Sequence, residues 1–326
     1  MKCRDCKYCN GIACAGEIPG LGGKDTGRSF IRNVEAMRNV RFNMDVTGDI
    51  TKINTTTTIL DMHLSFPVFV APIAGINNNY GVDISDDEYA RIVLEASEKT
   101  GIRAFTGDGI DLENLFFKPA LAIHERGGKG IVTIKPWIKE GVDARIDAIK
   151  DLNYEAVAMD IDAAGLPLLR AGKTPVENKN TEALRYVKQA VKKPFIVKGV
   201  MTLHAAKCAY EAGADAIVVS NHGGRVLDDT LSTIEVLPEI ANAYKGKLTI
   251  LMDGGIRSGM DIFKALALGA DGVLIGRPFA LAAVKNGSEG LVELINKYKD
   301  QLEQTMRMCG CSSLSDIDET KVRIIH

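Results

Sequence analysis

Short apolar runs rich in valine and isoleucine recur through the chain from residue 66 onward. Each is followed by a turn with glycine or aspartate and then by a helix-length amphipathic stretch. Their near-continuous hydrophobic character predicts strands buried on both faces, as in a parallel sheet. The alternation with helical segments indicates βαβ crossovers. The eight predicted strands lie in 66–72, 102–108, 130–136, 156–161, 194–200, 216–221, 248–255 and 272–277.

Eight strand–helix units are the number that closes a (β/α)8 barrel, or TIM barrel. The competing architecture is a doubly wound open sheet that binds a dinucleotide. Its G-x-G-x-x-G turn is missing after the first strand, where residues 71–79 read "APIAGINNN" with a single glycine. We therefore predict an α/β barrel preceded by an N-terminal extension, residues 1–65. Within this extension, residues 42–65 are expected to form short β-segments that cap the barrel.

Composition narrows the class of protein without naming a function. The 326 residues carry a formal net charge of −2 and are 46% hydrophobic and 25% charged, as in ordinary globular proteins. No basic stripe suggests a nucleic-acid partner. No apolar run approaches the ~20 residues of a membrane span, and the N-terminus does not read as a signal peptide. We expect a cytoplasmic protein, divided into a Cys-rich segment, 1–26, and a barrel domain, 27–326.

The loops after the last two predicted strands suggest an anion site. The active groups of this fold come from the C-terminal ends of its strands. Glycine-rich turns feed helix N-termini there, and backbone N–H groups and the helix dipole favour an anion. Arginine adds charge-assisted contacts. The alternative is tight turns beside solvated arginines, but the pattern favours a phosphate site around Gly254, Gly255, Arg257, Gly276 and Arg277.

Three other strand ends combine charged side chains with a histidine. Lys198 interrupts the apolar run "FIVKGV", where a lysine is unfavourable unless it reaches solvent or faces an anion or polar cofactor. His222 follows the next strand and shares the barrel mouth with Asp160. A carboxylate can orient an imidazole and stabilise its protonated form, as a general base requires. Arg225 could hold a substrate carboxylate beside that base.

Four stretches of the chain resemble the FMN-dependent α-hydroxy-acid dehydrogenase and oxidase family, which includes glycolate oxidase, lactate oxidase and flavocytochrome b2. They read "SNHGGRVLDD", "FIVKGV", "DGGIRSGMDIFKALALGADGVLIGRPF" and "TTTTILDMHLSFPVFVAPIAG". The similarity extends from about residue 27 to the C-terminus. It implies FMN as the cofactor and oxidation of an L-2-hydroxy acid, such as lactate, to the 2-oxo acid. It also implies a homo-oligomer, with a tetramer as the usual state.

The resemblance implies a role for each candidate residue. His222 takes the hydroxyl proton while hydride goes to flavin N5, Asp160 stabilises the resulting imidazolium, and Arg225 binds the substrate carboxylate. Lys198 lies by the flavin N1 and C2 carbonyl. The ribityl chain and phosphate are assigned to Asp253, Gly254, Gly255, Arg257, Gly276 and Arg277. The isoalloxazine ring is assigned to Ile73, Ala74, Thr106 and Thr133.

The sequence departs from the family on the substrate side. The family's N-terminal tyrosine is absent, and Lys135 stands where a second tyrosine is expected after the third strand. Only Arg170 could supply the family's second arginine, and it is displaced. Lys135 could therefore serve as a substrate-binding cation. Two alternatives stay open: a non-redox FMN barrel enzyme resembling type 2 isopentenyl-diphosphate isomerase, and a flavoprotein with altered substrate or lost turnover. Oxygen, a quinone or a protein could accept the electrons.

Cysteines crowd into the first fourteen residues. Cys3, Cys6, Cys9 and Cys14 form C-x2-C-x2-C-x4-C, a spacing that suits an iron–sulfur cluster or zinc. The alternative is a reduced, mobile tail. Two further cysteines, Cys309 and Cys311, could add ligands.

Overall fold

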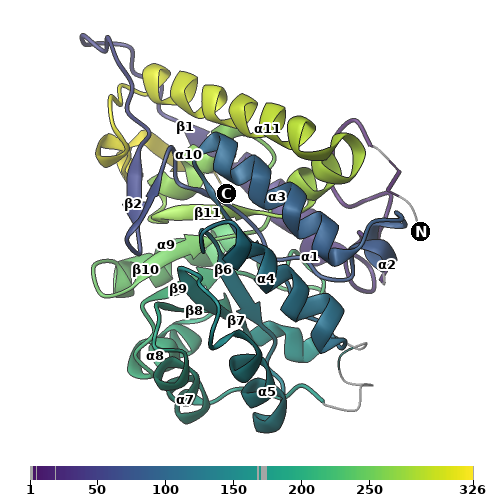
Figure 1. Cartoon of the computed structure of the whole chain (residues 1–326). Coiled ribbons are helices and arrows are strands. Elements are labelled where there is room, and N and C mark those ends of the chain that lie inside the picture. The colour runs from purple at the N-terminus through teal and green to yellow at the C-terminus, as the bar shows by residue number, and fades with distance from the viewer. Residues whose placement is uncertain (1–2, 5, 19, 167–168, 170–174, 326) are drawn as a thin grey trace.

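The computed structural model describes residues 3–325 except 5, 19, 167–168 and 170–174. At its centre, parallel strands close into a barrel in chain order from β4 to β11, and β11 pairs back with β4 (Figure 1). Each predicted run contains one barrel strand, so the predicted (β/α)8 barrel is confirmed. The strands are β4 Val68–Val70, β5 Arg103–Thr106, β6 Ile131–Ile134, β7 Ala156–Asp160, β8 Phe195–Val200, β9 Ala216–Val219, β10 Thr249–Met252 and β11 Gly272–Ile275.

Helices between the strands form the outer layer of the barrel (Figure 1). Their ends follow local sequence signals. The helix at 86–100, for example, begins after Ser85 and Glu88 form a reciprocal capping box and ends at Gly101, which has φ 72°. The helices are α2 Ile76–Tyr80, α3 Asp86–Thr100, α4 Lys118–Glu125, α5 Lys139–Ile149, α7 Thr181–Val191, α8 Leu203–Glu211, α9 Thr233–Tyr244, α10 Gly259–Ala267 and α11 Arg277–Met308; short helical turns are η1 Glu113–Phe117, η2 Ile161–Gly165, η3 Leu314–Asp316 and η4 Glu319–Lys321.

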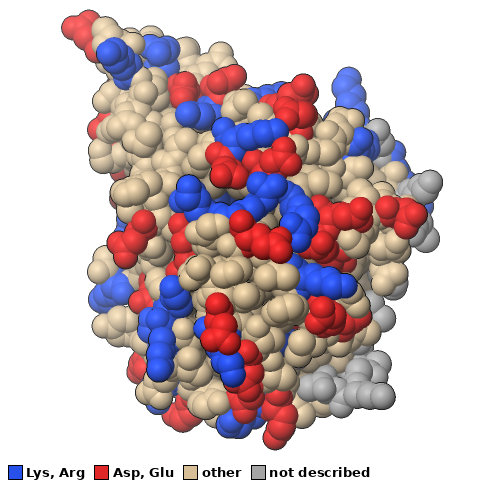
Figure 2. All heavy atoms as spheres, in the orientation of Figure 1, with Lys and Arg blue, Asp and Glu red and all other residues tan. Residues whose placement is uncertain are grey.

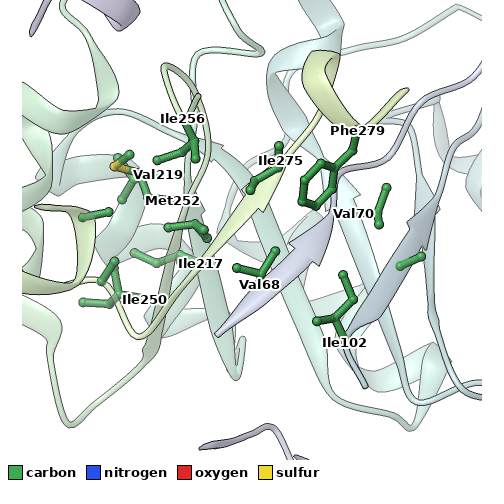
Figure 3. Packing of buried hydrophobic residues seen from close by; sticks show 14 of the residues in the cluster. Val68, Val70, Ile102, Ile217, Val219, Ile250, Met252, Ile256, Ile275 and Phe279 are labelled. Carbon is green, nitrogen blue, oxygen red and sulfur yellow. The ribbon is translucent and has the colours of Figure 1, made fainter. Parts of the chain in front are cut away.

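Side chains alternate between two buried layers along each barrel strand. Phe69 points into the barrel, whereas Val68 and Val70 belong to the layer between strands and helices. Figure 3 shows this outer layer, with Phe279 of α11 lying between Ile275 and Val70. Burial on both faces explains why the strands read as unbroken apolar runs in the sequence.

A hairpin closes one end of the barrel. Strands β2 Thr57–Ile59 and β3 Met62–Leu64 pair antiparallel. Ile59, Met62 and Leu64 are buried and join the cluster of side chains inside the barrel. The predicted β-segments that cap the barrel are therefore confirmed here. A second antiparallel pair, β1 Val40–Phe42 with β12 Val322–Ile324, joins the extension to the C-terminal end of the chain.

Helix α1, Arg28–Asn39, lies against the loops that follow β9 and β10. Asn33 and Asn221 exchange side-chain hydrogen bonds of 2.8 and 3.1 Å. Arg32 Nε lies 2.7 Å from a carboxylate oxygen of Glu235 on α9. The extension thus contributes to the C-terminal mouth of the barrel as well as to the opposite, capped end.

Asp228, in the loop after β9, fixes the start of α1 and makes folding sensitive to acid. Its carboxylate accepts hydrogen bonds from the backbone N–H groups of Thr26 (2.8 Å) and Ser29 (3.0 Å) and from the Thr26 hydroxyl. Burial opposes ionisation, but these bonds lower the pKa of Asp228 to about 2. Since an unfolded aspartate has a pKa of about 3.9, this contribution is complete above about pH 4 and is lost as pH falls towards 2.

We expect the Asp228→Asn variant to show a smaller loss of thermal stability between pH 5 and pH 2.5 than the wild type. Thermal unfolding followed by circular dichroism measures the difference in Tm at each pH. The Asp229→Asn variant is the matched control, because Asp229 is exposed. Identical pH dependence in wild type and Asp228→Asn would contradict the assignment.

Acidic and basic side chains are interleaved on the face drawn in Figure 2. The chain as a whole carries 40 basic and 42 acidic residues, so neither sign of charge dominates. Among the described residues, no helix combines the length and apolar character needed to cross a bilayer.

Candidate active site at the barrel mouth

A cavity of about 330 Å³ opens at the C-terminal ends of the strands, a size within the usual range for small-molecule sites. Most residues predicted for the site line it. They are Ile73, Ala74, Lys135, Lys198, His222, Arg225, Asp253, Gly254, Gly255, Arg257, Gly276 and Arg277. Three others, Thr106, Thr133 and Asp160, are buried in the strands beneath. The predicted residues come from the ends of all eight barrel strands and are thus brought to one place.

Asp160 is the centre of a buried charge cluster. The pairing of β7 with β8 places Asp160 opposite Lys198, whose Nζ lies 2.8 Å from Asp160 Oδ1 and 3.3 Å from Asp253 Oδ2. Lys135 donates to the other oxygen of Asp160. Burial opposes ionisation, yet His222 and the two lysines hold the pKa of Asp160 well below its usual range. Burial likewise disfavours the Lys198 cation, but the carboxylates raise its pKa.

Asp162 is the nearer carboxylate to the candidate base. His222 Nδ1 lies 2.9 Å from Asp162 Oδ1 and 3.5 Å from Asp160 Oδ1. The short helix η2 starts directly after β7 and turns Asp162 back towards the mouth. Burial raises the pKa of Asp162, with Asp160 adding to the effect. The predicted partner, Asp160, therefore lies farther from the imidazole than Asp162, which stands two residues later in the sequence.

The turn that carries the histidine is left-handed over three residues. His222, Gly223 and Gly224 have φ of 56°, 62° and 78°. Only glycine adopts such values without strain, and a Cβ on Gly224 would lie 2.3 Å from the backbone nitrogen of Phe30. A histidine held at positive φ is an unfavourable conformation of the kind found at functional sites. The "HGG" sequence thus serves both to present His222 and to let α1 approach.

Arg225 is a cation in the cavity with neutral partners. Its guanidinium donates to the backbone carbonyl of Gly20 and, at 3.0 Å, to Asn79 Oδ1. Burial lowers the pKa of Arg225. Neither partner neutralises its charge, so a carboxylate ligand would find both a bidentate donor and an uncompensated cation here.

Arg257 and Arg277 also donate to carbonyl oxygens. Arg257 Nε lies 2.8 Å from the Cys9 carbonyl, and Arg277 Nε lies 2.7 Å from that of Leu21. Burial, and then the repulsion of Arg225 and Arg257, lower the pKa of Arg277 to about 10. Three clustered guanidinium groups favour a bound anion.

The two helix N-termini beside these arginines differ in their freedom to bind that anion. In α10, the Asp261 carboxylate already accepts hydrogen bonds from the Arg257 backbone N–H and the Ser258 hydroxyl at the first turn. In α11, Gly276 caps the helix without a side-chain hydrogen bond, and the first turn has no acidic residue. We therefore place the candidate phosphate site at the start of α11, between Arg257 and Arg277.

Orphaned polar atoms at the strand ends suit a polar planar cofactor such as FMN. Thr106 Oγ1, Thr133 Oγ1 and Asp253 Oδ1 are buried and lack a hydrogen-bond partner within the part of the chain that the structure describes. Leaving such atoms unpaired is unfavourable. The residues present therefore fit a cofactor with ring heteroatoms and hydroxyl groups at this mouth and an anion at α11.

The cysteine-rich segment lies over the same mouth. Arg257 Nη2 lies 3.7 Å from Cys9 Sγ. Three metal-binding atoms approach within 4.8 Å of one another only at Asp160, Asp162 and His222, among the described residues. The N-terminal cysteines do not form such a group. Lys135 and Lys198 already neutralise Asp160, so the acidic group is better explained as part of the charge cluster.

The two C-terminal cysteines do not extend the predicted metal site. Cys309 and Cys311 are buried, and the Cys311 thiol donates to the carbonyls of Cys309 and Asp316. The idea that they add metal ligands finds no support in these contacts. Arg170 lies outside the described residues.

Asp108 fixes the loop that presents Lys135. It accepts a 2.8 Å hydrogen bond from the Lys135 backbone N–H and is held by Arg145 and by Trp137 Nε1. All four residues are buried. The sequence placed Asp108 at a strand end, but nothing in the pattern indicated which basic residue would pair with it.

The chain belongs to the FMN-dependent dehydrogenase family, whose sequence profile matches residues 21–168 and 173–324. This match confirms the predicted class, an FMN-dependent oxidoreductase, and it disfavours the non-redox isomerase. The (β/α)8 barrel and the residues at its mouth, which fit FMN, agree with this match.

Relatives and solved structures cover nearly the whole chain. Peroxisomal (S)-2-hydroxyacid oxidase GLO3 of Arabidopsis thaliana is 30% identical over 353 residues, 93% of this chain and 90% of the relative. Glycolate oxidase 5 of Oryza sativa subsp. japonica is 32% identical over 320 residues, 89% and 86% respectively. A crystal structure of mandelate oxidase has a TM-score of 0.77 at 27% identity and covers 93% of this chain and 91% of its own.

Proposed function

We propose that the protein oxidises an L-2-hydroxy acid to the 2-oxo acid, with FMN as the hydride acceptor. The observation that carries the proposal is His222, held by Asp162 and Asp160, in one cavity with the uncompensated Arg225. A base and an anion clamp are the two groups that a hydroxy acid needs. Relatives named (S)-2-hydroxyacid oxidase and glycolate oxidase support the same chemistry.

In this mechanism the imidazole removes the hydroxyl proton. Asp162 binds Nδ1, which leaves Nε2 for the substrate and stabilises the imidazolium that forms. Arg225 binds the substrate carboxylate and orients the C2 hydrogen. Bound FMN supplies the acceptor for that hydrogen as hydride. Lys198, kept cationic by Asp160 and Asp253, offsets negative charge beside the ring.

The cofactor contacts follow the predicted assignment. Arg257, Gly276 and Arg277 would hold the phosphate at α11, while Asp253, Gly254 and Gly255 would contact the ribityl chain. Ile73, Ala74, Thr106 and Thr133 would line the ring. Lys135 remains a proposed substrate contact, since its ammonium group lies in the cavity beside Asp160.

The substrate is proposed to be lactate-like, with an apolar group on C2. Several apolar side chains also line the cavity; they are Ile18, Leu21, Ile110, Leu115, Leu166 and Leu169. A polar substituent would lose hydration there without gaining partners. We test this with glycolate, L-lactate, longer 2-hydroxy acids and L-malate, detecting each 2-oxo acid as its hydrazone. Best turnover with malate, or 2-oxo acid from none of them, would overturn the proposal.

The Asp162→Asn variant is expected to slow flavin reduction about 10–100-fold, because an orienting partner of a catalytic imidazole is lost. FMN content should be unchanged, and the pH profile of kcat/KM should shift relative to the wild type. Anaerobic stopped-flow absorbance measures the rate of flavin reduction, and steady-state kinetics at a series of pH values measures the profile of kcat/KM.

Asp160→Asn provides the contrast. It removes the counter-ion of Lys135 and Lys198, so we expect lower FMN content and a lower Tm. A wild-type rate and pH profile in Asp162→Asn would show that Asp160 alone orients the base.

The acceptor, assembly and location are proposed from the sequence. Oxygen, a quinone and a protein are distinguished by the rate at which each reoxidises the reduced enzyme. We propose a homo-oligomer, a tetramer by resemblance, and a cytoplasmic location. Some relatives are named peroxisomal, so microscopy of the tagged chain in its host is the test of location.

A further inference from the structure

The cysteine-rich segment is anchored to the barrel, in contrast to a mobile tail. Its backbone closes on itself through Gly16 N–H to the Gly23 carbonyl (3.0 Å) and Gly22 N–H to the Glu17 carbonyl (3.2 Å). Arg4 spans the segment to Glu17 at 2.6 Å. A folded unit of this length with almost no apolar core usually needs a cross-link or a metal.

The N-terminal thiols lie beside the barrel mouth. Cys9 Sγ is 3.7 Å from Arg257 Nη2. The Cys14 thiol donates to the Gly11 carbonyl at 3.8 Å and is close enough to Cys6 and Cys9 for their charges to interact. No disulfide joins the cysteines of the described chain. Their spacing in sequence and their convergence in space are independent observations that point to a shared ligand.

We propose that Cys3, Cys6, Cys9 and Cys14 bind an iron–sulfur cluster that docks on Arg257. A single zinc would need sulfurs about 3.8 Å apart, from a Zn–S bond of about 2.3 Å in tetrahedral geometry. No three of these sulfurs lie within 4.8 Å of one another. A [4Fe–4S] cluster places each thiolate on a different iron and so holds the sulfurs further apart.

The surroundings suit the charge of such a cluster. Arg257 Nη2 donates to Cys9 Sγ at 3.7 Å, and its Nε donates to the Cys9 carbonyl at 2.8 Å. N–H donors and cations near the sulfurs stabilise a thiolate-bound cluster and tune its potential. Arg277 lies close enough to Cys14 for their charges to interact. The cysteine-rich segment therefore contacts the barrel at Arg257 and Arg277, the two arginines that are proposed to bind the cofactor phosphate.

Arg257 is thus shared between two sites. One face of its guanidinium is fixed by Cys9, and the same side chain is assigned to the cofactor phosphate. Loss of the cluster should release Cys9, Gly20 and Leu21 from Arg257, Arg225 and Arg277 and weaken FMN retention. This coupling rests on the proposed FMN site, whereas cluster binding itself does not depend on hydroxy-acid oxidation.

Anaerobically purified protein provides the test. We expect about four iron and four sulfide per chain, a broad absorbance near 400 nm after FMN removal, and an EPR signal upon reduction. In Cys9→Ser most of the iron should be lost, and the FMN content should fall several-fold. Cys208→Ser is the matched control, because Cys208 lies half-buried on α8, and it should retain both.

Three results would overturn the proposal. They are zinc in place of iron, no metal after anaerobic reconstitution with iron and sulfide, and wild-type iron content in Cys9→Ser. If Cys9→Ser does not fold, Cys6→Ser replaces it, because Cys6 is exposed and its loss disturbs no packing. Iron retained without any hydroxy-acid turnover would support the cluster while rejecting the proposed reaction.

Discussion

Replacing His222 with glutamine should slow reduction of bound FMN by the hydroxy acid about 10²–10⁴-fold, the range that a positioned general base contributes. Glutamine keeps a hydrogen-bonding side chain but cannot take the hydroxyl proton. Because His222 pairs with Asp162 and Asp160 and makes no contact assigned to the phosphate, FMN content should remain that of the wild type. Single-turnover reduction under anaerobic conditions measures the chemical step directly.

A decrease of less than about tenfold in His222→Gln would assign proton removal to another group. The Gln189→Ala variant is a suitable control for handling and loading, since Gln189 lies on the outer helix α7. Equal rates in the control and wild type would confirm that any loss in His222→Gln arises at the mouth.

Replacing Arg225 with leucine should lower kcat/KM about 10²–10⁴-fold, chiefly through KM. Two charge-assisted hydrogen bonds to the substrate carboxylate are lost, each contributing about 1.5–3 kcal/mol. Arg225→Lys retains the charge without the planar fork and should fall between the leucine variant and the wild type. Steady-state kinetics with a fixed acceptor provides both constants.

A neutral substrate analogue separates this role from a structural one. The 2-hydroxy amide lacks the anion, so its kcat/KM should change little between wild type and Arg225→Leu. Equal losses for acid and amide would instead mean that Arg225 only ties Gly20 and Asn79 to the mouth.

The barrel could be predicted because its physics is local and repetitive. Burial on both faces makes each strand an unbroken apolar run. The capping residues of helices such as 86–100 can be recognised in the sequence. The strand ends then follow from the fold, so Lys198, His222, Arg225 and Arg257 could be gathered before any coordinates. The glycines beside them indicated where the backbone must turn sharply or approach closely.

The partners of those side chains could not be predicted in the same way. Asp160 and Asp162 are two residues apart, and only the turn of η2 decides which one meets His222. The sequence indicated a cation at Lys135, but the register of β6 with β7 and the Asp108 loop are what bring it to Asp160. Such contacts depend on ångström-scale placement that hydrophobic periodicity does not encode.

The place of the cysteine-rich segment was also beyond the sequence pattern. Spacing suggested a metal site but not where it would lie, because the contacts of Cys9 and Gly20 are backbone carbonyls. Carbonyl groups are present in every residue and leave no sequence signal. We propose that residues 1–26 and residues 27–326 form two units of the chain that share one interface.

The most direct measurement is the absorbance of the FMN-loaded protein mixed anaerobically with each enantiomer of a 2-hydroxy acid. The account predicts that the L enantiomer bleaches the flavin band near 450 nm and yields one 2-oxo acid per flavin. The D enantiomer should leave the band unchanged. A protein that takes up no FMN, or a loaded protein whose spectrum no hydroxy acid alters, would contradict the account.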